Sequence, residues 1–472
     1  MQVCPIFYLK KQKKVFKRFK NYKATKLTRL LFVVLSVFSF FFIFLNTGIR
    51  YDLWVLAVFF LIAFFSLYSI FISIDTKGFS LNKSFSLFFY FFFSLAPAYQ
   101  FKNKTSFFIT DYLPSEVYLK YGIILLIILL FYILLYHIGF NYLCGNKFRF
   151  LNAKFKQGKK NKDNLIVMYL LVIISFISFM YLIKWDWTLL VYRPFLYRLK
   201  YNTNLGFVGY AISLILRLIP FIVLLYYKIQ NKTNNKHIYF FLIMLLFANF
   251  PTSLSRGVLA IIYIPVFILF IPKLRQGVNY VLLFMGGLLV IFPLFNNFRY
   301  LKEGIVNSNF ELFNTAHFDA FQNFALLLDE NIITNGNQLL GSVLFFIQEA
   351  QWENKPNGTG HLLGETIGYS YLNVSMPYFG EGYANWGYLG MVIFLIFIAF
   401  FNAFFDVISK KPNLKSWIYS LYLILLGFEF YLMRGDLYSS IKIFSSFLMA
   451  MLVVWLLFLI HSKIIKKLLS KV

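Results

Sequence analysis

Residues 117–140 read VYLKYGIILLIILLFYILLYHIGF, with a single charged residue, Lys120. About 20 consecutive apolar residues span the hydrocarbon core of a bilayer as a helix. Similar blocks recur along the whole chain, so the sequence predicts an all-α polytopic membrane protein with about twelve transmembrane helices. The predicted spans are residues 30–46, 53–74, 84–98, 117–140, 165–183, 206–227, 238–253, 257–272, 278–295, 387–405, 417–432 and 438–460.

The composition of the 472-residue chain agrees with this class. Hydrophobic residues make up 60% and charged residues 14%, and the mean hydropathy is +0.69. These values exclude a disordered chain, a collagen-like chain and a soluble globular protein. The two cysteines, Cys4 and Cys144, are too few for a disulfide framework or a cysteine-based zinc site.

The distribution of charge predicts the orientation of the spans. With a cytoplasmic N-terminus, most of the 46 Lys and Arg residues fall in cytoplasmic segments, and most of the 18 acids fall outside. This is the positive-inside pattern, and it predicts that both termini are cytoplasmic. The net charge of +28 is then explained by topology and by attraction to anionic lipid of the bilayer. No nucleic-acid partner is expected.

The predicted organisation has four parts. Residues 1–29 form a basic cytoplasmic tail, and residues 30–295 form the first nine spans. Residues 296–386 form a large extracytoplasmic loop, and residues 387–472 hold the last three spans and a second basic tail. The block 238–253 is interrupted at Pro251, so it is either a full span or a re-entrant segment. Neither choice changes the orientation of the other spans.

The long external loop is the predicted location of function, because loops of this length without regular structure are usually functional. No Gly-rich phosphate loop, Asp-x-Asp pair or His-Glu-x-x-His motif occurs in the chain. The sequence therefore predicts no cofactor and no metal site.

A set of arginines on the outer side is the first candidate binding site. Several guanidinium groups at one membrane face are a suitable receptor for a diphosphate, because each donates parallel charge-assisted hydrogen bonds. The alternative is a structural role, such as an ion pair between an embedded arginine and Glu429. The candidates are the external Arg193, Arg256, Arg299 and Arg434, together with Arg217, which lies in the middle of the predicted span 206–227.

The distal half of the loop is the second candidate region. Trp352 and Tyr383 could stack on sugar rings, although an interfacial aromatic belt is the alternative. Glu381 lies among glycines just before a predicted span, where a carboxylate could act as a general base. Its alternative role is that of an acid at a helix N-terminus.

Residues 344–356 (LFFIQEAQWENKP) and 373–387 (NVSMPYFGEGYANWG) resemble the bacterial oligosaccharide repeat-unit polymerases, also called O-antigen polymerases. Ser255-Arg256-Gly257 and Arg434-Gly435-Asp436 are similar to two shorter elements of that family. The motif match covers mainly residues 336–390. One departure is Gln348-Glu349, where the family commonly has Pro-Arg, so the charge at that position is reversed.

The resemblance implies a GT-C-like membrane glycosyltransferase of the bacterial plasma (inner) membrane. It would polymerise undecaprenyl-diphosphate-linked oligosaccharide repeats into a surface polysaccharide, either capsule or the O-antigen of lipopolysaccharide. Its expected partners are the lipid-linked repeat, the bilayer, a chain-length regulator and a flippase. The alternatives are a ligase for lipid-linked glycan and a flippase or transporter of lipid-linked oligosaccharide.

The same resemblance gives the candidate residues their roles. The five arginines would hold the donor diphosphate, and Glu381 or His361 would take the proton of the acceptor hydroxyl. The acceptor sugar would be oriented by Trp352, Asn373, Tyr383 and Asn385.

Overall fold

The computed structural model describes residues 26–45, 52–72, 78–108, 112–145, 165–191, 206–230, 235–291, 313–411 and 414–469. Every regular element within these ranges is a helix.

Eight helices in the described ranges are long and apolar enough to cross a membrane, as expected for a polytopic membrane protein. They are α2 (Lys26–Phe44), α3 (Leu53–Phe71), α6 (Ser115–Gly145), α7 (Leu165–Leu182), α10 (Gly206–Ile229), α18 (Tyr378–Ile408), α19 (Ser416–Arg434) and α20 (Leu437–Leu469).

The four remaining predicted spans coincide with helices that are shorter or interrupted, so the count of twelve stays a prediction. One of them is a helix that runs without a break through α4 (Leu81–Tyr90), a π-helical turn η1 (Phe91–Leu95) and α5 (Ala96–Lys102). The other three coincide with α11 (Asn235–Ala248), α12 (Arg256–Phe270) and α13 (Asn279–Gly286), the last of which continues into a second π-helical turn, η6 (Gly287–Ile291).

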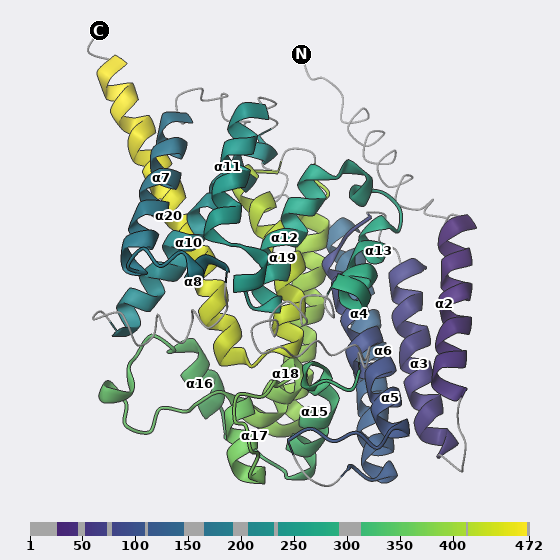
Figure 1. Ribbon diagram of the computed structural model, residues 1–472. Coiled ribbons are helices and arrows are strands. Elements are labelled where there is room, and N and C mark those ends of the chain that lie inside the picture. The colour runs from purple at the N-terminus through teal and green to yellow at the C-terminus, as the bar shows by residue number, and fades with distance from the viewer. Residues whose placement is uncertain are drawn as a thin grey trace, which may run out of the picture.

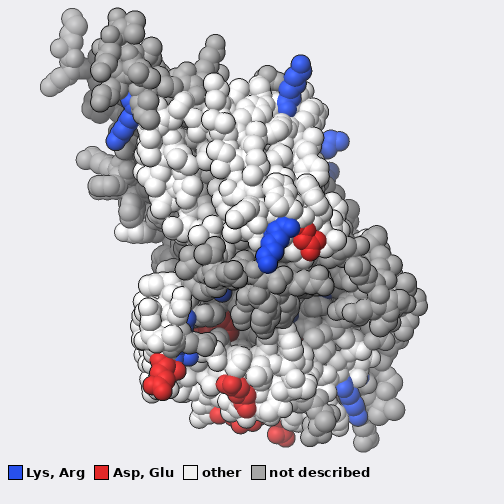
Figure 2. All heavy atoms as spheres, turned by 60° about the vertical axis from the view of Figure 1, so that its left-hand side comes forward, with Lys and Arg blue, Asp and Glu red and all other residues white. Residues whose placement is uncertain are grey.

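The helices form one bundle with a helical cap at one end (Figure 1). The start of α2 and the end of α20 lie at one end of the bundle, and the short helices α15, α16 and α17 lie at the other. Figure 2 shows a broad face without charged side chains above the end where acidic side chains gather. An uncharged band of this kind is typical of a surface that faces lipid.

The helix formed by α4, η1 and α5 is almost completely buried in the bundle. Its first turn is capped by a carboxylate from α18, because Asp406 accepts hydrogen bonds from the backbone N–H groups of Leu81 (2.9 Å) and Asn82 (3.2 Å). The hydroxyl groups of Tyr136 (2.9 Å) and Tyr422 (2.8 Å) also donate to Asp406. This network fixes the central helix to three of its neighbours.

Two glycines allow α12 and α19 to pack with their backbones in contact. A Cβ atom on Gly427 would lie 2.6 Å from the Cα atom of Ile261, and one on Gly257 would overlap the ring of Tyr431. Small residues at a helix crossing permit such a close approach in membrane proteins. Arg256, the first residue of α12, therefore lies beside the last part of α19.

Residues 313–377, called the loop module below, form the cap. They contain η8 (Ala316–Phe318), α15 (Ala320–Asp329), α16 (Asn337–Val343), η9 (Glu349–Gln351) and α17 (Thr359–Ile367). The ring of Phe321 packs on Phe59 (5.3 Å between centroids), and that of Phe318 packs on Phe92 (4.8 Å). The described part of the predicted external loop is thus a folded unit anchored on the bundle.

Candidate functional site

Glu381 lies in a short helical segment that is separated from the rest of α18 by a sharp break. The backbone leaves the helical conformation at Trp386 and at Gly387, where φ is 60° and ψ is −145°. Residues other than glycine rarely adopt this backbone conformation. Gly382 and Gly390 then pack face to face, since a Cβ atom on Gly382 would lie 2.8 Å from the carbonyl oxygen of Gly390.

The Glu381 carboxylate joins three elements of the structure. The side chain is buried, with a relative exposure of 1%. Its Oε2 atom accepts a hydrogen bond from the hydroxyl group of Thr359 (2.6 Å), the first residue of α17. Its Oε1 atom accepts one from the backbone N–H of Leu437 (2.8 Å), the first residue of α20. Glu381 is therefore held in one orientation by α17 and α20.

Asp436 lies beside Glu381, and the two side chains are called the carboxyl pair below. The carboxylate of Asp436 accepts hydrogen bonds from the backbone N–H groups of Gly360 and Tyr438, each 2.9 Å away. Burial raises the pKa of the Asp436 carboxyl group above its usual value, although these N–H groups and the neighbouring His361 act in the opposite direction.

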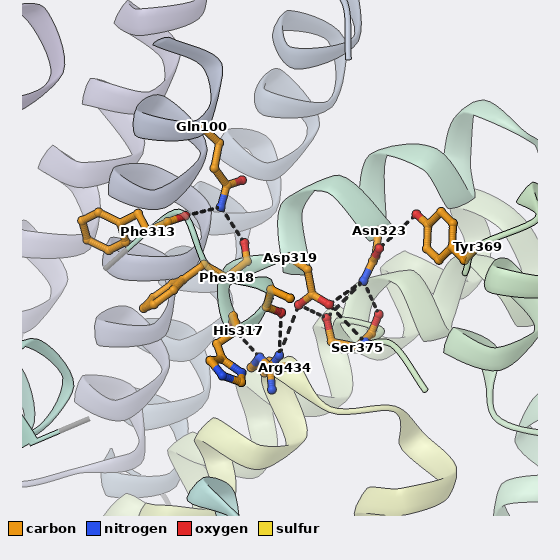
Figure 3. A network of polar contacts seen from close by, with 10 residues as sticks. Gln100, Phe313, His317, Phe318, Asp319, Asn323, Tyr369, Ser375 and Arg434 are labelled. Atoms are coloured by element: carbon orange, nitrogen blue, oxygen red, sulfur yellow. Dashed lines mark hydrogen bonds and ion pairs between the residues drawn. The ribbon is translucent and has the colours of Figure 1, made fainter. Parts of the chain in front are cut away.

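Arg434 ends α19 and points toward the loop module, as Figure 3 shows. Its Nε atom donates a hydrogen bond to the carbonyl oxygen of His317 (2.8 Å), and its Nη2 atom donates to Oδ1 of Asp319 (3.2 Å). The side chain remains 34% exposed. Its Nη1 group makes no hydrogen bond with any residue that the structure describes, so donors remain available for a ligand.

Asp319 is the centre of the polar network in Figure 3. Its Oδ1 atom also accepts a hydrogen bond from the Ser375 hydroxyl group (2.6 Å), and its Oδ2 atom accepts one from the side-chain amide of Asn323 (3.1 Å). The hydroxyl group of Tyr369 donates to Asn323 (3.2 Å). The network fixes the loop module to the end of α19.

His361 lies on α17, directly after Gly360. Its Nδ1 atom is 3.4 Å from Oε2 of Glu365 on the next turn of the same helix. The histidine is half-buried and lies near Asp436, whose pKa it lowers. Both predicted proton acceptors, Glu381 and His361, are thus found around Asp436.

Two of the four predicted sugar-binding residues lie in the interior. The hydroxyl group of Tyr383 donates to Oδ1 of Asn331 (2.6 Å). The side chain of Asn385 donates to the carbonyl oxygen of Glu381 (2.8 Å) and accepts from the backbone N–H of Leu339 (2.8 Å). These contacts are within the protein, so the structure gives both residues a positioning role.

The other two predicted sugar-binding residues are accessible. Asn373 is exposed. Trp352 is half-buried and lines a hollow in the loop module. A direct contact with sugar stays a prediction for both.

The predicted diphosphate-binding arginines do not all share one environment. Arg193 and Arg299 lie outside the described residues. Arg217 is buried and donates through Nε to the carbonyl oxygen of Ala248 (2.6 Å) and through Nη2 to the hydroxyl group of Ser253. Arg217 therefore stabilises the connection between α11 and α12.

Glu429, which was expected as the alternative partner of Arg217, makes its hydrogen bond with a different residue. Glu429 accepts a hydrogen bond from the side-chain amide of Asn402 (2.7 Å). Of the other predicted arginines that the structure describes, Arg256 begins α12, and Arg434 ends α19 and contacts His317 and Asp319 of the loop module.

Several residues of the site were not predicted as site residues from the sequence. They are Thr359, Asp319, Asn323, Ser375, Tyr369 and Asp436. Asp319 and Asn323 are four residues apart at the start of a mainly apolar helix, and this spacing puts their polar side chains on one face. Within the described ranges no three His, Cys, Asp or Glu side chains gather into a possible metal site.

Comparisons of the chain with protein-family models, with curated proteins and with solved structures gave no match.

Proposed function

We propose that the protein polymerises lipid-diphosphate-linked oligosaccharide repeats into a surface polysaccharide at the outer face of the bacterial plasma membrane. One observation carries the proposal. Glu381 and the Arg434-Gly435-Asp436 element, which resemble two separate motifs of the repeat-unit polymerases, meet at one place, because Glu381 accepts a hydrogen bond from the N–H of Leu437. The meeting of the two motifs would be needed if both act on one substrate.

The proposed reaction transfers a glycan from its lipid carrier to the end of another glycan. The oxygen of an acceptor hydroxyl group forms a bond to the anomeric carbon of the donor sugar. The bond from that carbon to the diphosphate oxygen breaks, and the lipid diphosphate leaves. The acceptor proton passes to a carboxylate. No nucleotide is needed, because the lipid diphosphate is itself the leaving group.

The arginines and the carboxyl pair would divide this work. Arg434, whose Nη1 group makes no hydrogen bond with the described residues, and Arg256 at the start of α12 would stabilise the negative charge that develops on the departing diphosphate. Asp436 or Glu381 would accept the proton. The raised pKa of Asp436 brings this carboxyl group closer to the value that suits a general base near neutral pH.

A deletion strain tests the proposal. Loss of a polymerase leaves single repeats on the surface, loss of a ligase leaves long unattached chains, and loss of a transporter leaves repeats on the cytoplasmic side. We expect a gel of the surface glycan to show single repeats in place of a ladder, and the ladder to return with the wild-type gene. Either of the other two patterns would reject polymerisation.

The proposed sidedness has its own test. Glu353 is exposed in the loop module and Lys463 is exposed near the end of α20. In a variant without the native cysteines, Glu353→Cys should react with a membrane-impermeant maleimide in intact cells, whereas Lys463→Cys should react only after lysis. The reverse labelling would place the carboxyl pair on the wrong side for this reaction.

A further inference from the structure

The loop module contains a polar hollow of ≈ 560 Å³ between α16 and α17. Its lining combines the ring of Trp352 with the side chains of Asn337, Asn354 and Asn357. A flat aromatic surface beside side-chain amides is suited to a ligand that has apolar ring faces and hydroxyl groups at its edge. Carbohydrates have this combination of surfaces.

Gln338, on the wall of this hollow, has an unsatisfied acceptor. Its side chain is 5% exposed, and its Oε1 atom has no hydrogen-bond partner among the residues that the structure describes. Buried polar atoms in proteins are nearly always hydrogen-bonded, so an exception calls for an explanation. A hydroxyl group of a ligand in the hollow would supply the missing donor.

The charged residues of the hollow already have partners in the protein. The Nζ atom of Lys355 donates to the carbonyl oxygens of Phe345 (2.9 Å) and Ile347 (2.7 Å) and to the hydroxyl group of Tyr438 (3.4 Å). These contacts use all three donors of an ammonium group. Glu365 faces His361 at 3.4 Å. Among the described residues that line it, the hollow therefore offers no available cation of the kind that a phosphate needs, and it is suited to a neutral ligand.

The hollow shares a wall with the carboxyl pair. Leu362 and Glu365 of α17 line the hollow, while Thr359 and Gly360 at the start of the same helix bind Glu381 and Asp436. Figure 1 shows α16 and α17 close to the start of α18. Helix α17 thus connects the hollow to the two carboxylates.

The opposite wall is positioned by residues of α18. Asn385 accepts a hydrogen bond from the backbone N–H of Leu339, and its carbonyl oxygen accepts one from Gly336 (2.9 Å). Both contacts fix the start of α16, which carries Gln338. Gly341 then packs on Pro356, because a Cβ atom on Gly341 would lie 2.5 Å from the Cγ atom of the proline. The shape of the hollow is therefore built into the fold.

From these observations we infer that the hollow is a binding site for a neutral oligosaccharide, with Trp352 stacking on a sugar ring and Gln338 Oε1 accepting a hydroxyl group. The inference rests on the proposed function in one respect, namely that the bound sugars belong to the glycan that is being extended. Recognition of the sugars themselves requires neither the lipid nor the diphosphate.

Binding is tested on the full-length protein in lipid nanodiscs. The probe is an array of lipid-free bacterial oligosaccharides that includes neutral, acidic and phosphorylated members, followed by calorimetric titration of the soluble form of a glycan that binds. We expect a neutral glycan to bind, and Trp352→Ala and Gln338→Leu each to weaken its affinity by about tenfold or more. Trp187→Ala, at an exposed tryptophan outside the hollow, should bind as the wild type does.

Gln338→Leu gives a second readout that a purely structural glutamine would not give. Because the Oε1 atom lacks a partner in the described structure, its replacement by an apolar group should leave the melting temperature unchanged or raise it, while the affinity falls. A lower melting temperature without loss of affinity would overturn the assignment. So would binding of phosphorylated glycans alone, equal affinity in both variants and the wild type, or no glycan binding at all.

The test separates this inference from the proposed function. Arg434→Ala should abolish polymer and leave the affinity for the lipid-free glycan unchanged, because Arg434 does not line the hollow. If Arg434→Ala bound the glycan and still made a normal polymer ladder, the proposed role of Arg434 in the reaction would be rejected. The glycan-binding site would be retained. Loss of polymer in that variant, with no glycan bound by the wild type, would reject the binding site alone.

Discussion

Nη2 of Arg434 lies 3.2 Å from Oδ1 of Asp319, and this ion pair joins the end of α19 to the start of α15. The carboxylate is almost completely buried and the guanidinium group is partly exposed. The protein thus fixes the Nε and Nη2 groups of Arg434, while part of the side chain remains accessible to solvent. This is the arrangement expected of a side chain that is oriented before its ligand arrives.

Removal of the Asp319 charge should loosen the loop module. Asp319→Asn keeps the shape of the side chain but weakens its contacts with Arg434 and Ser375. We expect the free energy of unfolding to fall by about 1–2 kcal/mol, which a thermal melt of the purified protein would detect. Glu330→Gln removes an exposed acid just beyond the other end of α15 and should have no effect. Equal melting temperatures for the wild type and both variants would show that the network does not stabilise the fold.

Arg256 and Arg434 should be needed for polymer formation and not for membrane insertion. We expect Arg256→Ala and Arg434→Ala to abolish the surface-glycan ladder while the protein remains in the membrane fraction. Lys273→Ala, an exposed residue just beyond the far end of α12, should leave the ladder intact. Polymer of normal length in both arginine variants, with the protein present, would end the assignment of these residues to the diphosphate.

The close crossing of α12 and α19 should not tolerate an added methyl group. Gly427→Ala would bring its Cβ atom to 2.6 Å from the Cα atom of Ile261, so the helices must separate. Overpacking of this kind costs about 1–3 kcal/mol. Gly286→Ala in α13 is the matched control, because an added Cβ atom there would meet no other described part of the protein within 4 Å, and it should melt at or slightly above the wild-type temperature. If Gly427→Ala melted at the same temperature as the control, the backbones of α12 and α19 would not be in close contact at Gly427.

Arg217 should stabilise the fold. Arg217→Gln removes charge-assisted hydrogen bonds to Ala248 and Ser253. We expect a loss of about 2 kcal/mol or more, measured as a lower melting temperature and a lower amount of protein in the membrane. Lys273→Gln, at an exposed lysine beyond the end of α12, should leave both quantities unchanged. If Arg217→Gln melts as the wild type does yet makes no polymer, Arg217 binds substrate after all.

Asp436 should make stability depend on pH in a specific direction. Burial raises the pKa of its carboxyl group, so the folded protein binds this proton more tightly than the unfolded chain does. The resulting stabilisation is complete below about pH 4, the usual pKa of an aspartate, and is lost as the pH rises through the raised pKa. The melting temperature of the wild type minus that of Asp436→Asn should therefore decrease from acidic toward neutral pH. An increase over this range would mean that the pKa is lowered instead.

The apolar blocks were sufficient to predict the main helices, because helix length and hydropathy are properties of the local sequence. The span predicted at 117–140 is α6, Ser115–Gly145, and the eight membrane-crossing helices all coincide with predicted spans. The interruptions are harder to predict. The π-helical turn at Phe91–Leu95 falls in a run of phenylalanines whose sequence carries no break signal.

The site was predicted only in part, because a sequence does not show which face of a segment points inward. Tyr383 and Asn385 were expected to contact sugar; in the structure both make hydrogen bonds within the protein, and the contact with sugar stays a prediction. Arg217 was expected to face a ligand or Glu429, yet it binds a backbone carbonyl group at the end of α11. Each outcome depends on contacts between segments 31 to 52 residues apart, which no local pattern specifies.

Helix α17 contacts the carboxyl pair at its first two residues and lines the hollow with its last two turns. Leu362 and Glu365, which line the hollow, lie two to six residues beyond Thr359 and Gly360, which corresponds to about 3–9 Å along the helix axis. A glycan docked in the hollow would therefore reach the carboxylates only if its free end extended by a similar length, and shorter or bulkier repeats would stop short of them or overshoot. The dimensions of one small helix would in this way act as a gauge that selects which repeats are joined.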